Sequence, residues 1–169
     1  MVNNSYKRFL TIDKILWCAK KKGGLQLREP NNNLAQAYLL KAQEALESMK
    51  INTIKDWKIS TAYYTMYFSL YAILTKIGVK CELHACTIAF AKEFLKKEFT
   101  QQDINLFEST LQARIDSQYY VDRTVPDEQY EKIIEQTPHI LVKAKDILTK
   151  LSEKRINNIR EAFKEHIST

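Results

Sequence analysis

One stretch of the sequence gathers side chains that could bind or cleave a phosphate group. It reads QARIDSQYYVDR, residues 112–123, and it contains two arginines, two aspartates and two adjacent tyrosines. A guanidinium recognises phosphate through paired hydrogen bonds, and a tyrosine can hydrogen-bond the same group or stack on a base. The stretch is therefore a candidate site for a phosphate-bearing ligand. Its members are Arg114, Asp116, Tyr119, Tyr120, Asp122 and Arg123.

The same residues also have an ordinary structural interpretation. A surface arginine–aspartate pair and two half-buried tyrosines would need no ligand. On an unbroken helix, Arg114 and Tyr119 lie about 140° apart, from five steps of about 100°. We therefore expect these two side chains to converge only if the helix ends between them.

A second cluster has the residue types of a metal site but not the usual spacing. Cys81, His84 and Cys86 form a C-x-x-H-x-C pattern. A structural zinc site usually has four ligands in two spaced pairs, and only the distant His139 or His166 could complete this one. We expect no metal here, with Cys86 as a small core residue and His84 at the start of a helix.

No cofactor is expected. The sequence has no phosphate-binding glycine loop of the GxxxxGK[ST] or GxGxxG type. No serine or cysteine has a recognisable nucleophile motif around it.

Composition restricts the class of protein further. The net charge of +6 and the pI near 9.1 permit binding to a polyanion without requiring it. Three cysteines, an odd number without paired spacing, favour a reducing compartment over a disulfide framework. No apolar run approaches the ~18–20 residues of a membrane span, and Asp13 and Lys14 interrupt the apolar stretch that a signal peptide needs. These features predict a cytoplasmic protein with no membrane association.

Residues 56–78 carry two apolar faces at helical spacing, whereas a surface helix needs one. We expect this helix to lie between other helices, at the centre of a bundle. Gly78 should end it, because glycine readily adopts the left-handed conformation that follows a helix. One face comprises Ile59, Tyr63, Met66, Leu70, Ile73 and Ile77, and the other comprises Tyr64, Phe68 and Tyr71.

Apolar spacing predicts further helices over residues 12–22, 33–50, 84–96 and 100–118, and from residue 127 onward. Thr11 could cap the first, Thr100 and Asp103 should cap the fourth, and Pro138 should kink or split the last. For residues 150–166 we predict either an exposed extension or a partner-binding helix. We predict an all-α, up-and-down bundle of five to six helices with no strand. Its parts are an N-terminal extension (1–30), the bundle (31–150) and a C-terminal extension (151–169).

Three stretches resemble the HEPN superfamily (higher eukaryotes and prokaryotes nucleotide-binding), in particular its small stand-alone archaeal and bacterial members. They are LAQAYLLKAQEALESMK at 34–50, STAYYTMYFSLYAILTKIGVKCELH at 60–84 and QARIDSQYY at 112–120. The tyrosine-pair helix in the second stretch is the most specific part. The resemblance covers about residues 34–150 and implies an up-and-down bundle of four or five helices.

The resemblance also implies a site. In active HEPN members an Arg-x(4–6)-His motif from each subunit of a homodimer meets its copy and cuts RNA without metal. The arginine binds the scissile phosphate, and the histidine assists proton transfer at the 2′-hydroxyl. Arg114 matches the arginine, but Tyr119 and Tyr120 stand after four and five intervening residues, where the histidine would be.

This departure changes the chemistry. A tyrosine with an ordinary pKa of about 10 is ionised about one time in a thousand at neutral pH, whereas a histidine exchanges protons freely there. Tyr119 is therefore a poor general base, although it could still contact a phosphate or a base. The resemblance implies a catalytic pair of Arg114 with Tyr119, and binding of RNA or a nucleotide through Arg114, Asp116, Tyr120 and Arg123.

Three functions follow from the sequence. The first is a non-cleaving or weakly cleaving HEPN homodimer that binds RNA or a nucleotide and acts with a nucleotidyltransferase partner. Such partners form toxin–antitoxin pairs with some HEPN members, in which a tyrosine near the motif can be nucleotidylated. By analogy, Tyr119 or Tyr120 would be that tyrosine here. The second is a metal-independent endoribonuclease in which Tyr119 or a distant residue replaces the histidine. The third is a helical adaptor whose tail, residues 150–166, binds a partner helix.

Overall fold

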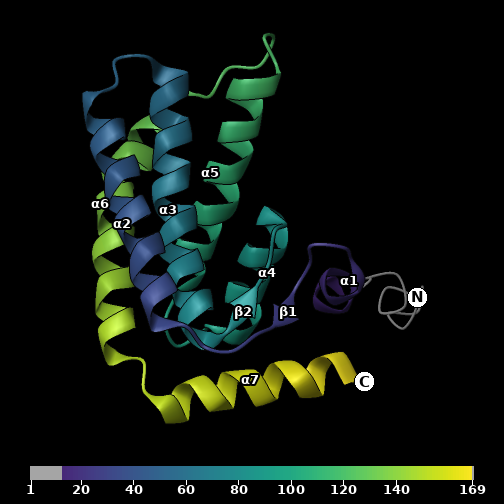
Figure 1. The fold of residues 1–169 in the computed structure, drawn as a ribbon. Helices are drawn as coiled ribbons and strands as arrows, with labels where there is room; N and C mark the ends of the chain where they lie inside the picture. The colour runs from purple at the N-terminus through teal and green to yellow at the C-terminus, as the bar shows by residue number, and fades with distance from the viewer. Residues whose placement is uncertain (1–12, 169) are drawn as a thin grey trace, which may run out of the picture.

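The computed structural model describes residues 13–168 and is an all-α helical bundle (Figure 1). Its seven helices exceed the five or six expected, and two short segments pair as an antiparallel sheet where no strand was predicted. Thr11 lies outside the described residues, and Asp13 caps the first helix. The elements are α1 (Lys14–Lys20), β1 (Gln26–Leu27), α2 (Asn32–Ile51), α3 (Lys55–Ile77), β2 (Val79–Lys80), α4 (His84–Phe94), α5 (Gln101–Tyr119), α6 (Asp127–Lys150) and α7 (Glu153–Ser168).

Helix α3 is the central helix, as the sequence predicts. It packs against α2, α5 and α6, and its first apolar face is fully buried. Its second face is less covered than expected, because Tyr64 and Phe68 remain half-buried. The helix ends at Gly78 with a φ of 84°. A Cβ there would lie 2.4 Å from the Arg28 carbonyl oxygen, so a side chain would have no room.

The C-terminal segment is part of the core, so the prediction of an exposed extension is wrong. Ile156, Ile159 and Phe163 on α7 are at most 1% exposed, and the helix contacts α1, α3 and α4 (Figure 1). Arg155 fixes its start through a 2.8 Å ion pair with Glu98. The apolar residues expected to bind a partner helix are thus occupied within the chain.

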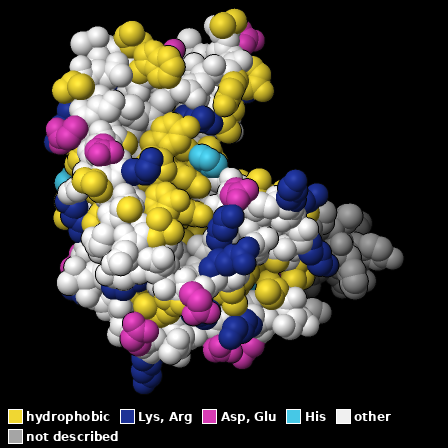
Figure 2. Space-filling view, in the orientation of Figure 1, with side chains coloured by type: hydrophobic (Ala, Val, Ile, Leu, Met, Phe, Trp, Pro, Cys, Tyr) yellow, Lys and Arg dark blue, Asp and Glu magenta, His cyan; other side chains and the backbone are white. Residues whose placement is uncertain are grey.

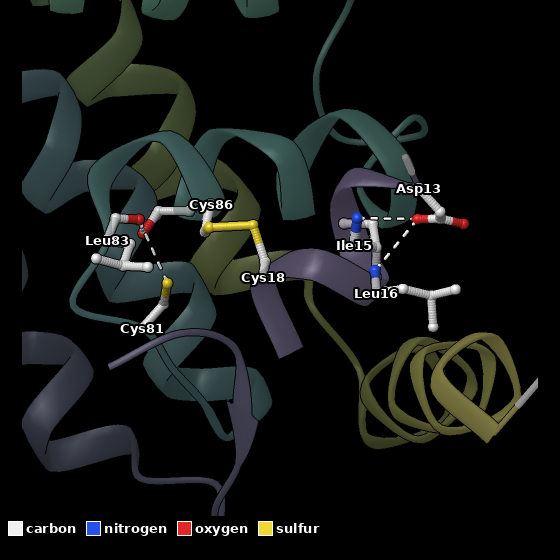
Figure 3. The surroundings of a disulfide bond; sticks show 8 residues. Asp13, Ile15, Leu16, Cys18, Cys81, Leu83 and Cys86 are labelled. Atoms are coloured by element: carbon white, nitrogen blue, oxygen red, sulfur yellow. Dashed lines mark hydrogen bonds between the residues drawn. A yellow bond between two sulfur atoms is a disulfide. The ribbon is translucent and has the colours of Figure 1, made fainter. Parts of the chain in front are cut away.

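A disulfide joins Cys18 on α1 to Cys86 in the first turn of α4 (Figure 3). The expectation of a reduced chain without a disulfide is therefore wrong. The two cysteines are 68 positions apart, and only the packing of α1 on α4 brings them together. Cys86 is also the buried core residue that was predicted. Cys81 stays a free, buried thiol that donates to the Leu83 carbonyl oxygen.

Two other local predictions have different outcomes. Thr100 and Asp103 form the predicted capping box at the start of α5. Pro138 does not split the last helix, because α6 runs without a break from Asp127 to Lys150. The ring removes one backbone N–H donor. Next to the proline, the Thr137 hydroxyl donates a hydrogen bond to the Ile133 carbonyl oxygen at 2.6 Å.

Within residues 13–168, none of the helices combines the length and apolar character needed to cross a bilayer.

Breaking the disulfide should destabilise the fold. In the chain-entropy model a loop of 68 residues contributes up to about 4 kcal/mol to the free energy of unfolding. We expect a Cys18→Ala, Cys86→Ala double variant to unfold at lower urea concentration by circular dichroism. Reductant should lower the wild-type midpoint and leave that of the double variant unchanged. Equal wild-type midpoints with and without reductant would contradict this bond's role.

Candidate functional site

Arg114 lies on α5 with its guanidinium against tyrosine rings. Its Cζ atom is 6.0 Å from the ring centroid of Tyr63, 5.6 Å from that of Tyr64 and 5.4 Å from that of Tyr119. Its Nη2 donates a hydrogen bond to the Tyr64 hydroxyl at 3.0 Å. Two of these tyrosines come from α3, and Tyr119 is the last residue of α5. We call Tyr63, Tyr64 and Tyr119 the tyrosine cage.

The cage holds the charge of Arg114 without neutralising it. In the part of the chain that the structure describes, no carboxylate forms an ion pair with Arg114, and its Nε is buried without a hydrogen-bond partner. A guanidinium carries five N–H donors, and the hydrogen bond to Tyr64 uses one of them. Ring faces attract a cation but provide no negative charge to pair with it. Arg114 is therefore prepared to bind an anion.

The other three predicted binding residues form a separate cluster. Arg123 Nη1 is 2.7 Å from Asp116 Oδ1, and the Arg123 Cζ lies 3.6 Å above the ring centroid of Tyr120. The hydrogen bond from Arg123 lowers the pKa of the Asp116 carboxyl. Asp116 thus pairs with Arg123 and leaves Arg114 uncompensated. The structure brings Arg114 and Tyr119 together. Asp116, Tyr120 and Arg123 form a second cluster, in which Arg123 contacts both of the other two residues.

Arg114 and Tyr119 converge although α5 does not end between them, so the geometric condition set from the sequence is wrong. The helix continues to Tyr119, yet the arginine Cζ reaches to 5.4 Å from the Tyr119 ring. Both side chains are long, and Tyr119 occupies the last helical position, where no further turn restricts its ring. The angle between two positions on a helix does not account for the length of such side chains.

His84 is the residue that sequence reasoning missed at this site. From the first position of α4, its Nδ1 lies 2.5 Å from the Tyr63 hydroxyl oxygen. Its ring is stacked on that of Tyr67, with the centroids 4.2 Å apart and the planes 6° from parallel. The sequence indicates His84 only as a possible metal ligand and as the start of a helix, and the helix start is confirmed. Its place in the site was missed because no local spacing links it to Tyr63, which is 21 positions earlier.

The protonation of this pair follows from its surroundings. Burial lowers the pKa of His84, and the positive charge of Arg114 lowers it further. Burial raises the pKa of Tyr63, so its phenol keeps its proton. Among the described residues, His84 is the one hydrogen-bond partner of that hydroxyl. Tyr63 therefore donates to Nδ1, and the neutral imidazole carries its hydrogen on Nε2.

The site thus combines a fixed cation with a neutral imidazole through one shared tyrosine. Tyr63 lies beneath the Arg114 guanidinium and bonds His84 at the same time. An anion held by Arg114 would therefore lie one aromatic ring away from an imidazole whose Nε2–H can donate a hydrogen bond. Such an arrangement can hold an anion at Arg114 and offer a second hydrogen-bond donor nearby.

The C-x-x-H-x-C pattern does not assemble. Cys86 is in the disulfide, Cys81 donates to Leu83, and His84 bonds Tyr63. Across the described residues, no three His, Cys, Asp or Glu side chains gather as a metal site.

No protein-family model matches the sequence, and no curated protein matches it. Function is therefore inferred from the geometry of Arg114, the tyrosine cage and His84, together with the resemblance in sequence.

We predict that His84 is neutral at pH 7, with its hydrogen on Nε2. Its pKa should lie below the ordinary value of about 6.5. Arg114→Gln should raise that pKa, because it removes the nearby positive charge that disfavours the imidazolium. An NMR titration of the imidazole measures both the pKa and the tautomer.

Arg123→Gln is the matched control, because it removes the same charge from the separate cluster and should leave the His84 pKa unchanged. A His84 pKa above 6.5, or one that does not respond to Arg114→Gln, would contradict the electrostatic link.

Proposed function

We propose that the protein is a HEPN-type homodimer that binds RNA or a nucleotide through Arg114 and acts with a nucleotidyltransferase-type partner. One observation carries the proposal: a half-buried guanidinium held by tyrosine rings, with no carboxylate pairing it among the described residues. This arginine stands where the resemblance expects the phosphate-binding residue.

The cage suits a nucleotide better than a simple anion. Arg114 supplies the charge for a phosphate, while Tyr119, with 66% of its surface exposed, offers a ring on which a base can stack. Tyr119 also replaces the histidine of the motif and is a poor general base. Binding without efficient cleavage is the function that these two residues support.

Exposed apolar side chains beside the cage support a homodimer. A cavity of about 360 Å³ lies between the start of α3 and the end of α5, lined in part by Ile54, Trp57 and Tyr119. The first two are also more than half exposed, at 56% and 54%. Exposed apolar clusters of this kind mark protein–protein contacts. A second copy at this end would bring two Arg114 cages close together.

A nucleotidyltransferase partner is part of the same proposal. It rests on the resemblance to toxin–antitoxin members in which a tyrosine is modified. Tyr119 is the better acceptor, because it is 66% exposed, whereas the Arg123 guanidinium covers the ring of Tyr120 at 3.6 Å.

A cytoplasmic location belongs to the same proposal, because its ligands are RNA and nucleotides. The Cys18–Cys86 disulfide argues against a reducing compartment. Both cysteines are 0% exposed, however, so a thiol reductant reaches the bond only when the fold opens.

A second function, metal-independent cleavage of RNA, is favoured by His84. Cleavage through the 2′-hydroxyl needs a group that protonates the departing 5′-oxygen. The Nε2–H of neutral His84 can donate a hydrogen bond that stabilises the charge developing on that oxygen while water supplies the proton, and the hydrogen bond from Tyr63 fixes the imidazole. In this reading His84 on α4 supplies an imidazole that the motif positions lack, and it acts at the departing oxygen and not at the 2′-hydroxyl.

RNA binding in the presence of EDTA tests both functions. We expect fluorescence anisotropy to show binding that weakens at least tenfold in Arg114→Ala, because the phosphate loses its charge partner. Arg123→Ala should change the affinity much less, since Arg123 is already paired with Asp116.

The same samples on a gel separate the two functions. Cleavage that disappears in both Arg114→Ala and His84→Ala would establish the ribonuclease and refute the non-cleaving module. If the wild-type protein neither binds nor cuts RNA and binds no nucleotide, both functions are wrong.

The homodimer is tested by light scattering at tens of micromolar. We expect a dimer that Trp57→Glu weakens, because a charge would enter the apolar contact. Val142→Glu is the control, because Val142 is 65% exposed on α6, outside the proposed contact. A wild-type monomer at this concentration would remove the two-copy site.

A further inference from the structure

Three aromatic rings continue the site beyond Arg114 along α3. Tyr64 and Phe68 are one turn apart on α3, with ring centroids 5.7 Å apart and planes 25° from parallel. Tyr38 from α2 follows at 6.1 Å from Phe68, again at 25°. All three are half-buried, so part of each ring remains exposed to solvent. We call Tyr64, Phe68 and Tyr38 the aromatic ladder.

Two cations lie against the ladder without an acidic partner. Arg114 is above the ring of Tyr64, and the Lys41 Nζ is 5.5 Å from the ring centroid of Phe68. Neither forms an ion pair with a carboxylate in the described part of the chain. Figure 2 shows a band of hydrophobic side chains down one face of the molecule, with Lys or Arg side chains on both sides of the band.

The far end of the ladder opens into a cavity of about 370 Å³ between α2, the end of α3 and β2. Tyr38 belongs to both the ladder and the cavity wall, and Leu34, Tyr71 and Val79 extend the apolar wall. Arg28 and Lys80 line it as well, with Glu29 as the one acidic residue of the lining. Ring-shaped and anionic groups can therefore both be accommodated at this end.

We propose that the aromatic ladder and this cavity bind a single-stranded nucleic acid that continues from Arg114. Bases would stack against the exposed parts of the Tyr64, Phe68 and Tyr38 rings, phosphates would pass Lys41, and one base would enter the cavity. Proteins that bind single strands combine stacking rings with a cationic groove in this way. The proposal rests on the proposed function. It adds the path of the strand, which runs along α3 from Arg114 to the cavity, and a dependence of the affinity on strand length.

The charges favour this occupant over a protein helix. An amphipathic partner helix would cover the rings but would bury Lys41 and Arg114 without an anion, which is costly. A nucleic-acid duplex would offer phosphates but not the faces of its bases. A single strand offers base faces to the rings and phosphates to the cations.

The test measures anisotropy of labelled single-stranded RNA from about four to about sixteen nucleotides, with the duplex of the same sequence for comparison. We expect affinity to rise with length until the path is filled, and the duplex to bind more weakly. Phe68→Leu keeps the apolar packing but removes the ring, and should weaken single-strand binding about tenfold. Tyr130→Leu is the matched control, since Tyr130 carries a lysine over its ring on α6 instead.

The salt dependence of RNA binding tests the role of Lys41. Lys41→Gln should reduce the slope of log affinity against log salt by about one, because one phosphate contact is lost. Lys50→Gln, in the last turn of the same helix and paired with Glu47, should leave the slope unchanged.

Each outcome separates this inference from the proposed function. RNA binding that requires Arg114, yet is unchanged in Phe68→Leu and equal for duplex and single strand, would overturn the path and leave the function standing. A Phe68→Leu variant that loses dimerisation but keeps its RNA affinity would make the face a protein interface and also overturn it. No RNA binding by the wild type would defeat both.

Discussion

A guanidinium held by aromatic rings instead of a carboxylate is the interaction on which the site depends. Burying part of an arginine without a counter-ion costs free energy, and the tyrosine cage offsets some of it, by about 0.5–2 kcal/mol for each cation–ring contact. A carboxylate would hold Arg114 more tightly but would also cancel its charge. Asp116 is two positions away and is engaged by Arg123. The positive charge of Arg114 therefore stays available to a ligand.

Helix α3 makes this possible because its residues serve the core and the site together. Tyr63 is 2% exposed and packs in the bundle, yet its ring lies below Arg114 and its hydroxyl bonds His84. Tyr64 and Phe68, on the adjacent row, are open enough to meet a ligand. A rigid central helix thus fixes the orientation of the rings, and the rings fix the arginine from the neighbouring helix α5.

Sequence periodicity was sufficient for features that are local. The two apolar faces of α3, its end at Gly78 and the Thr100–Asp103 capping box all depend on residues a few positions apart. The Cys18–Cys86 bond and the His84–Tyr63 contact join residues 68 and 21 positions apart, and only packing determines them. The convergence of Arg114 and Tyr119 depends on side-chain reach, which a helical angle does not include. Long-range contacts therefore hold most of the site's chemistry.

The two terminal segments outside the resemblance bear on the position of His84. Cys18 on α1 is bonded to Cys86, two positions after His84, and Phe163 on α7 packs edge-on against Phe90 of α4. Both segments thus restrain the short helix that begins with this histidine. An imidazole on a separate eleven-residue helix needs such restraint, whereas one on α5 beside Arg114 would not. The disulfide and the packed terminal helix thus fix an imidazole that comes from a different helix than Arg114 and is linked to it through Tyr63.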